Sequence, residues 1–157
     1  MFGDCSSLTS VNFPVCTSIG QEAFRCTSLT SVNFPACTEI GESAFYSCTS
    51  LTSVNFPECM YIGSFAFLGC SSLTSVSFPA CTDIGIAAFA GCSSLSRLYL
   101  TASSVVTLGF SVFDATPIRN SSYLGYYGSI YVPAELISSY QTASNWSYYS
   151  DRFAAIE

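Results

Sequence analysis

The stretch Cys26–Ser47, with the sequence CTSLTSVNFPACTEIGESAFYS, carries the pattern that decides the fold. The same pattern begins at Cys5, Cys48 and Cys70 and, in a longer and more divergent form, at Cys92. The first cysteines of successive units stand 21 or 22 residues apart. A fixed period of this length indicates a repeat protein, in which each unit forms one coil of a stack.

Each unit combines a short strand with a tight helical turn. In the segment SVNF, Val32 and Phe34 fall on one face of a strand, and the polar residues between them fall on the other. Pro35 ends the strand because it has no N–H to donate. The segment ESAF after Gly41 is too short for a full helix, so we expect one or two helical turns there.

The unit is itself made of two similar halves, CTSLTSVNFPA and CTEIGESAFYS, which have Cys first, Leu or Ile fourth and Phe ninth. We interpret the halves as the two walls of one flattened coil. A single coil cannot bury its apolar residues, but a stack of coils can. The sequence therefore predicts five inward columns: Leu8, Leu29, Leu51, Leu73, Leu95; Val11, Val32, Val54, Val76, Leu98; Phe13, Phe34, Phe56, Phe78, Leu100; Ile19, Ile40, Ile62, Ile84, Leu108; and Phe24, Phe45, Phe67, Phe89, Phe113.

The composition changes after Thr116. The segment SIYVP at Ser129–Pro133 matches SVNFP of the repeats, so we predict a sixth strand in parallel register with the others, with Ile130 and Val132 inward. A helix is expected from about Ala134, with Leu136, Ile137 and Tyr140 on one face. A last helix is expected to be capped by Asn145 and to hold Trp146, Tyr149 and Phe153.

These patterns predict two parts. Residues 1–116 hold five repeat units with a truncated N-terminal end, and residues 117–157 form a C-terminal cap with the sixth strand and helices. Residues 1–4 are too few to cover a coil, so the N-terminal side is expected to be open. An exposed coil edge over Leu8, Val11 and Phe13 predicts end-to-end self-association through that coil.

The pattern CxSLTSVxFPxCTxIGxxAFxxC, which extends over Phe2–Ala115, resembles the BspA-like leucine-rich repeat of bacterial surface proteins. The resemblance implies an α/β, right-handed solenoid with a parallel β-sheet on one face, short helical turns on the other and a C-terminal helical cap. It also implies a non-enzymatic interaction or adhesion module, at the cell surface or secreted, with a protein or host-surface ligand. The alternative is a rigid spacer that presents another domain.

The charge pattern excludes some partners. The net charge is −6 and the four arginines are spread along the chain, so there is no basic patch for nucleic acid. Only 9% of residues are charged, against about 25% in ordinary soluble domains. The sequence contains neither an apolar run long enough to span a bilayer nor a recognisable signal peptide at its first residues.

The nine cysteines recur at the same two places in the unit. Their spacing of ten or eleven residues and the absence of histidine disfavour a metal site. A nucleophilic cysteine needs a neighbouring base, and the chain has neither histidine nor lysine, so neither a cysteine nucleophile nor a serine triad is expected. We predict no catalytic, cofactor or metal site. Packing of free thiols is the favoured interpretation, and disulfides between neighbouring coils remain an alternative because stacked coils lie within bridging distance.

The outward strand positions suggest a binding surface. They are Ser or Asn in the first four coils, where they predict a ladder of asparagine hydrogen bonds, and then change to Arg97 with Tyr99 and to Ser129 with Tyr131. Tyr and Arg are enriched at binding hot spots. The candidate partner-binding residues are therefore Arg97, Tyr99 and Tyr131, with the loop residues Tyr123, Tyr126 and Tyr127. The alternative is that the loop folds over Tyr99 and Tyr131.

Overall fold

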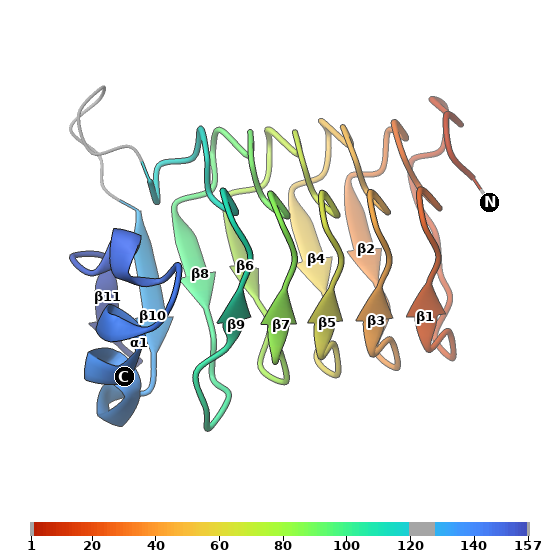
Figure 1. The fold of residues 1–157 in the computed structure, drawn as a ribbon. Coiled ribbons are helices and arrows are strands. Elements are labelled where there is room, and N and C mark those ends of the chain that lie inside the picture. The colour runs from red at the N-terminus through yellow and green to blue at the C-terminus, as the bar shows by residue number, and fades with distance from the viewer. Residues whose placement is uncertain (1, 120–127, 157) are drawn as a thin grey trace.

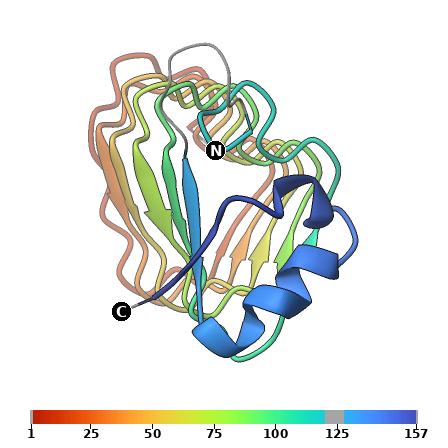
Figure 2. The same ribbon diagram turned by 90° about the vertical axis from the view of Figure 1, so that its left-hand side faces the viewer.

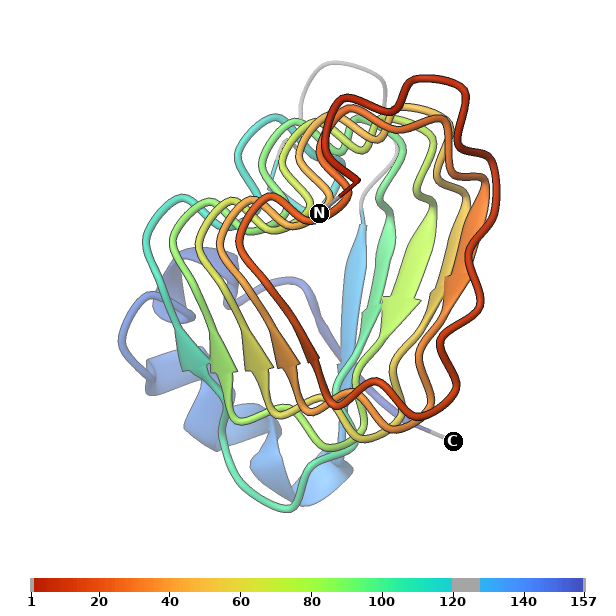
Figure 3. The same ribbon diagram turned by 90° about the vertical axis from the view of Figure 1, so that its right-hand side faces the viewer.

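The chain forms a stack of flattened coils with parallel strands on two walls, as the computed structural model shows for residues 2–119 and 128–156 (Figure 1). The solenoid expected from the repeats is confirmed. Viewed from the N-terminal end, the two walls face each other across the core (Figure 3). One wall carries a five-stranded parallel sheet of two-residue strands: β1 (Ser18–Ile19), β3 (Glu39–Ile40), β5 (Tyr61–Ile62), β7 (Asp83–Ile84) and β9 (Thr107–Leu108).

The other wall carries the strands predicted from the SVNF segments. It is divided into two parallel sheets, one of β2 (Ser31–Asn33) and β4 (Ser53–Asn55), the other of β6 (Ser75–Ser77), β8 (Arg97–Tyr99), β10 (Ser129–Val132) and β11 (Phe153–Ala155). The expected register is confirmed where these strands pair: Val32 lies beside Val54, and Leu98 lies between Val76 and Ile130. The expected strand around Val11 is wrong, because residues 10–12 form no ladder and Val11 is only half-buried.

The five inward columns form the core. From the second coil onward their members are buried, except Val54, which is half-buried. Two phenylalanine stacks run along the coils: Phe45 and Phe67 lie 5.1 Å apart between ring centroids in one, and Phe34 and Phe56 lie 5.5 Å apart in the other. Edge contacts such as that of Phe56 with Phe67 join the stacks, so the two walls share one core.

The wall that carries β1, β3, β5, β7 and β9 differs from the expected helical wall, because each coil contributes a short strand followed by turns. After Gly41, the amides of Ser43, Phe45 and Ser47 donate to carbonyl oxygens of the next coil at 2.8–2.9 Å, instead of to their own coil. Ser43 and Ser47 adopt positive φ, at 54° and 56°. Left-handed residues at these two places prevent a continuous helix.

The repeated glycine allows adjacent coils to approach each other. A Cβ on Gly63 would lie 2.7–2.8 Å from backbone atoms of Ile40, Gly41 and Glu42 in the preceding coil. Gly41, Gly85 and Gly109 meet the same obstacle, whereas a Cβ on Gly20 would have nothing within 4 Å. The glycine is therefore required by stacking and not by the turn.

The C-terminal segment closes the stack (Figure 2). Pro133 is followed by a 3₁₀ turn η1 (Ala134–Leu136) and the helix α1 (Ile137–Thr142), where the sequence predicted a helix. The last predicted helix is wrong: a 3₁₀ turn η2 (Ser147–Tyr149) leads into β11, in which Phe153 pairs with Ile130 of β10. Asn145 is not a side-chain cap of η2 and instead donates from Nδ2 to the carbonyl of Leu108 at 2.6 Å.

Side chains of this segment take the place of a further coil. The amide of Gly109 donates to the carbonyl of Ile84, as the corresponding glycine does in each preceding pair of coils, and the Asn145 amide replaces that donor at Leu108. The indole of Trp146 donates from Nε1 to the carbonyl of Val106 at 2.6 Å, and the Tyr140 hydroxyl accepts from the Val106 amide at 3.1 Å. The carbonyls of Leu108 and Val106 and the amide of Val106 are thereby satisfied without another repeat.

All nine cysteines are free thiols, and the six from Cys37 to Cys92 are buried. They follow two hydrogen-bonding patterns. Cys37 donates from Sγ to the carbonyl of Glu39, two residues ahead, at 3.2 Å. Cys70 donates to the carbonyl of Phe45, 25 residues earlier in the chain, also at 3.2 Å. The thiol packs as a small apolar group and also satisfies a backbone acceptor, which explains why cysteine recurs in both walls.

Candidate functional site

The predicted patch lies at the outward face of β8 and β10. Tyr99 and Tyr131 are register partners on these adjacent strands, and their rings stack with centroids 4.6 Å apart and planes 10° from parallel. Both side chains are half-buried. Stacking fixes the two rings in one orientation, so the pair offers a rigid amphipathic surface at low entropic cost.

Arg97 lies two residues before Tyr99 on the same face of β8. Its side chain is exposed and forms no ion pair with any described residue. The structure therefore brings together Arg97, Tyr99 and Tyr131, which we call the sheet patch. The three loop tyrosines that complete the prediction, Tyr123, Tyr126 and Tyr127, lie outside the described residues, as does the alternative in which the loop covers the patch.

The same face of earlier coils is polar and self-paired. Asn55 donates from Nδ2 to Oδ1 of Asn33 at 2.7 Å, so the predicted asparagine ladder is confirmed for this pair. On the far side of the sheet patch, Tyr131 lies beside Ala154 of β11, a residue too small to cover the ring. The sheet patch is thus bordered by the small polar residues Ser75 and Ser77 of β6 on one side and by Ala154 of β11 on the other.

Burial makes several of the thiols poor nucleophiles. Burial raises the pKa of Cys59 and of Cys81 to about 12, and it also raises the pKa of Cys37 and Cys48. A thiol with a raised pKa holds little thiolate at neutral pH, and thiolate is the reactive form. Among residues 2–119 and 128–156, no group of three or more Cys, Asp or Glu side chains is arranged to hold a metal ion.

A second change along the coils escaped the sequence analysis. The residue after the repeated glycine is polar in the first three coils, where it is Gln21, Glu42 and Ser64, and then becomes Ile86 and Phe110. Ile86 is 46% exposed and Phe110 is 66% exposed. The signal is visible in the sequence, because the residue after the repeated glycine changes from polar to apolar between the third and fourth coils.

The N-terminal coil exposes apolar side chains. Phe13 is 37% exposed and Phe2 is 41% exposed; the ring of Phe2 stacks on that of Phe24, and the ring of Phe13 lies tilted against it. With Ile19 and Phe34 they line a hollow of about 210 Å³. This surface is where the sequence predicts contact with another chain.

Comparison with known proteins places the repeats in a family. The family described as "BspA type Leucine rich repeat region (6 copies)" matches residues 1–120. A solved structure of a leucine-rich repeat protein from Bacteroides ovatus is similar at 20% sequence identity and a TM-score of 0.48. The similar region covers 83% of this chain and 45% of that protein, so the chain spans less than half of its length. No curated protein sequence matches the chain.

The matched family is associated with bacterial surface proteins, and leucine-rich repeats generally mediate protein interactions. Solenoids of this kind are typically non-enzymatic. Where the chain is described, it has no helix long and apolar enough to cross a membrane.

Proposed function

Because the chain belongs to the BspA-type leucine-rich repeat family, we propose that it is a non-enzymatic module that binds a protein or host-surface ligand through the sheet patch. We further propose that this binding serves adhesion, at a bacterial cell surface or in a secreted protein. The observation that carries the proposal is the stacked pair Tyr99 and Tyr131 beside the exposed Arg97. Core packing does not require these side chains, because they face away from it.

The proposal also covers how the patch is presented. Parallel ladders on both walls and a shared phenylalanine core hold the coils in fixed register. A rigid support lowers the entropic cost of binding. We also propose that the chain divides into repeats over residues 1–116 and a cap over residues 117–157, with the patch near the junction of the two parts.

A paired substitution tests the sheet patch. Arg97→Ser with Tyr99→Asn installs the outward residues of β2 and β4 on β8. The matched control is Ser75→Ala with Ser77→Ala on the adjacent strand β6. Binding would be measured by surface plasmon resonance against a panel of purified extracellular and host-surface proteins, and stability by urea unfolding. We expect the first variant to lose about tenfold or more in affinity for any bound protein, with its free energy of unfolding unchanged.

Two outcomes would contradict the proposal. A loss of stability with unchanged binding would show that Tyr99 is a packing residue. Failure of every panel member to bind the unmodified chain would favour the alternative, a rigid spacer.

The hollow of the N-terminal coil supports a second mode of association. We propose that Phe2 and Phe13 mediate end-to-end self-association, because exposed contiguous aromatic surface favours burial against another chain. Sedimentation equilibrium should detect dimers at millimolar concentration, and Phe13→Ser should shift the equilibrium to monomer. A monomer at all concentrations would contradict this.

A further inference from the structure

The last coil and the cap together form a second concave site, on the opposite wall from the sheet patch. It has a volume of about 260 Å³ and is lined by Gly109, Phe110, Ser111, Arg119, Asn145 and two tyrosines of η2, Tyr148 and Tyr149. Phe110 follows β9, whereas Tyr148 comes from the cap. The site exists only where the cap meets the stack, and no earlier coil can form it.

Its rim is aromatic. Tyr148 is 81% exposed and Phe110 is 66% exposed. None of the equivalents of Phe110 in earlier coils is aromatic, so stacking of the coils does not demand a ring at this position; they are Gln21, Glu42, Ser64 and Ile86. Two large rings held in water beside a hollow offer flat apolar contact area that the fold itself leaves unused.

The polar lining of the site contains both donors and acceptors. The amides of Ala87 and Phe65 donate to the next coil, but the equivalent amide of Ser111 has no such partner among the described residues. Asn145 uses its Nδ2 donor on Leu108, and its Oδ1 has no partner within the same part of the chain. Within the described residues, the site therefore presents an unpaired N–H of Ser111 and an unpaired amide oxygen of Asn145.

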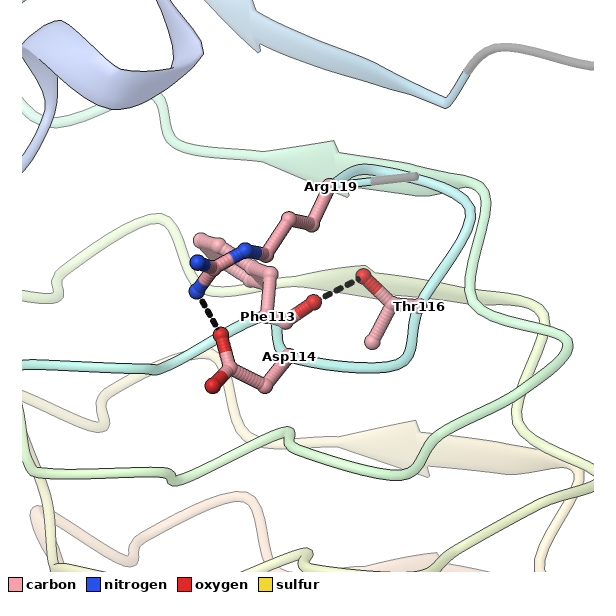
Figure 4. Close-up of polar contacts among 4 residues, drawn as sticks. All are labelled: Phe113, Asp114, Thr116 and Arg119. Atoms are coloured by element: carbon pink, nitrogen blue, oxygen red, sulfur yellow. Dashed lines mark hydrogen bonds and ion pairs between the residues drawn. The ribbon is translucent and has the colours of Figure 1, made fainter. Parts of the chain in front are cut away.

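The local charge is balanced. Arg119 reaches back over the last coil and pairs with Asp114, as Figure 4 shows. It also lies close enough to the Tyr149 hydroxyl to oppose the rise in the pKa of Tyr149 that burial causes. Asp114 does not line the hollow, but it balances the charge of Arg119, and the guanidinium keeps N–H donors beyond the pair, so this end of the site adds donors without net charge.

These features discriminate among ligand classes. An anion would find the charge of Arg119 already balanced by Asp114 and would face the Asn145 oxygen, and a cation would meet Arg119. A neutral ring with hydroxyl groups on its edge and an apolar C–H face matches all the features, because hydroxyls both donate and accept while the face packs on Phe110 or Tyr148. We infer that this is a binding site for a neutral sugar ring at the end of a glycan. It is independent of the sheet patch.

Saturation-transfer NMR on the whole chain tests this inference with oligosaccharides that end in neutral hexoses or N-acetylhexosamines, at up to about 10 mM. We expect transfer to the terminal ring of at least one of them. Tyr148→Ala and Phe110→Ser should each weaken that binding by about tenfold, and both should fold because the side chains are exposed. The matched control is Tyr61→Ala, which removes a tyrosine that is 43% exposed on β5 and should leave binding unchanged.

Several results would overturn the inference: no transfer to any neutral glycan in the panel, transfer only to glycans that carry a carboxylate, or equal loss of binding in Tyr61→Ala and Tyr148→Ala. The variants at Arg97 and Tyr99 leave this site intact, so failure here is distinguishable from failure of the sheet patch.

Discussion

At the residue scale, the repeated Ile-Gly pair is explained by contact between coils. The side chain of Ile62 fills the core, and the missing side chain of Gly63 lets the backbone of the preceding coil lie against it. Gly20 has the same sequence context without the contact. Comparison of the two glycines therefore shows that stacking of the coils, and not the local turn, requires glycine at this position.

Alanine at these glycines tests the distinction. Gly63→Ala should lower the free energy of unfolding by about 1–3 kcal/mol or more, because its Cβ would overlap backbone that cannot move aside. Gly20→Ala should stay within about 0.5 kcal/mol of the unmodified chain. Urea unfolding measures both, and similar losses would contradict the role assigned to stacking.

The buried thiols predict sensitivity to alkali. Burial raises the pKa of Cys59 and Cys81 from 9.0 to about 12, so the unfolded chain loses these protons at lower pH than the folded chain. Their contribution to stability is full below pH 9 and is lost as pH rises toward 12. The free energy of unfolding should fall by up to about 1.4 kcal/mol per pH unit for each such thiol in this window.

Urea unfolding at neutral pH and at about pH 11 checks this prediction. Cys59→Ala should show a smaller alkaline loss than the unmodified chain. Cys5→Ser changes an exposed cysteine and serves as the control. If Cys59→Ala and Cys5→Ser had the same pH dependence, the thiol of Cys59 would not be the cause.

At the element scale, side chains of the cap make hydrogen bonds to the last coil in place of a further coil. Asn145 combines a positive φ of 64° with its side-chain hydrogen bond to Leu108. Asn145→Gly keeps the backbone freedom and loses the bond, so it should cost about 1–2 kcal/mol. Asn145→Ala loses the bond and adds left-handed strain, so it should cost about 1 kcal/mol more. Equal unfolding free energies for the two variants would contradict the backbone part of this account.

The strands predicted from the sequence are those that alternate. SVNF shows period-two patterning, and its strands form from β2 onward at the expected residues. The second sheet could not be predicted, because strands of two residues such as Glu39–Ile40 carry no alternation. Glu22 and Ser43 prevent a helix because both have positive φ, and this backbone conformation cannot be predicted from Glu or Ser as residue types. The spacing of Phe153 from Trp146 and Tyr149 predicts a helix, but pairing of Phe153 with β10 prevails.

The candidate site was predictable to a similar degree. A change of residue type in a column that packing leaves free pointed to Arg97, Tyr99 and Tyr131, and strand register brings them together. The site at Phe110 and Tyr148 needs the cap to fold against the last coil, a long-range contact that repeat spacing does not encode.

At the scale of the whole molecule, the repeats build a uniform support and the changes at the C-terminal coils provide recognition. Both proposed sites lie beside β8, β9 or the cap, where the outward side chains stop repeating. Both walls of the middle coils are packed, and the six cysteines from Cys37 to Cys92 are buried in them. Cysteine accessibility therefore reports on the walls coil by coil.

Alkylation mapped by mass spectrometry is the most direct test. In the native protein, Cys5, Cys16 and Cys26 should react fast and the six buried cysteines slowly: Cys37, Cys48, Cys59, Cys70, Cys81 and Cys92. After denaturation without a reductant, all nine should react, because all are free thiols. A single native reaction rate for all nine cysteines would contradict the burial of the two walls. One or fewer reactive thiols after denaturation would show that the cysteines form a ladder of disulfides and are not packed as free thiols.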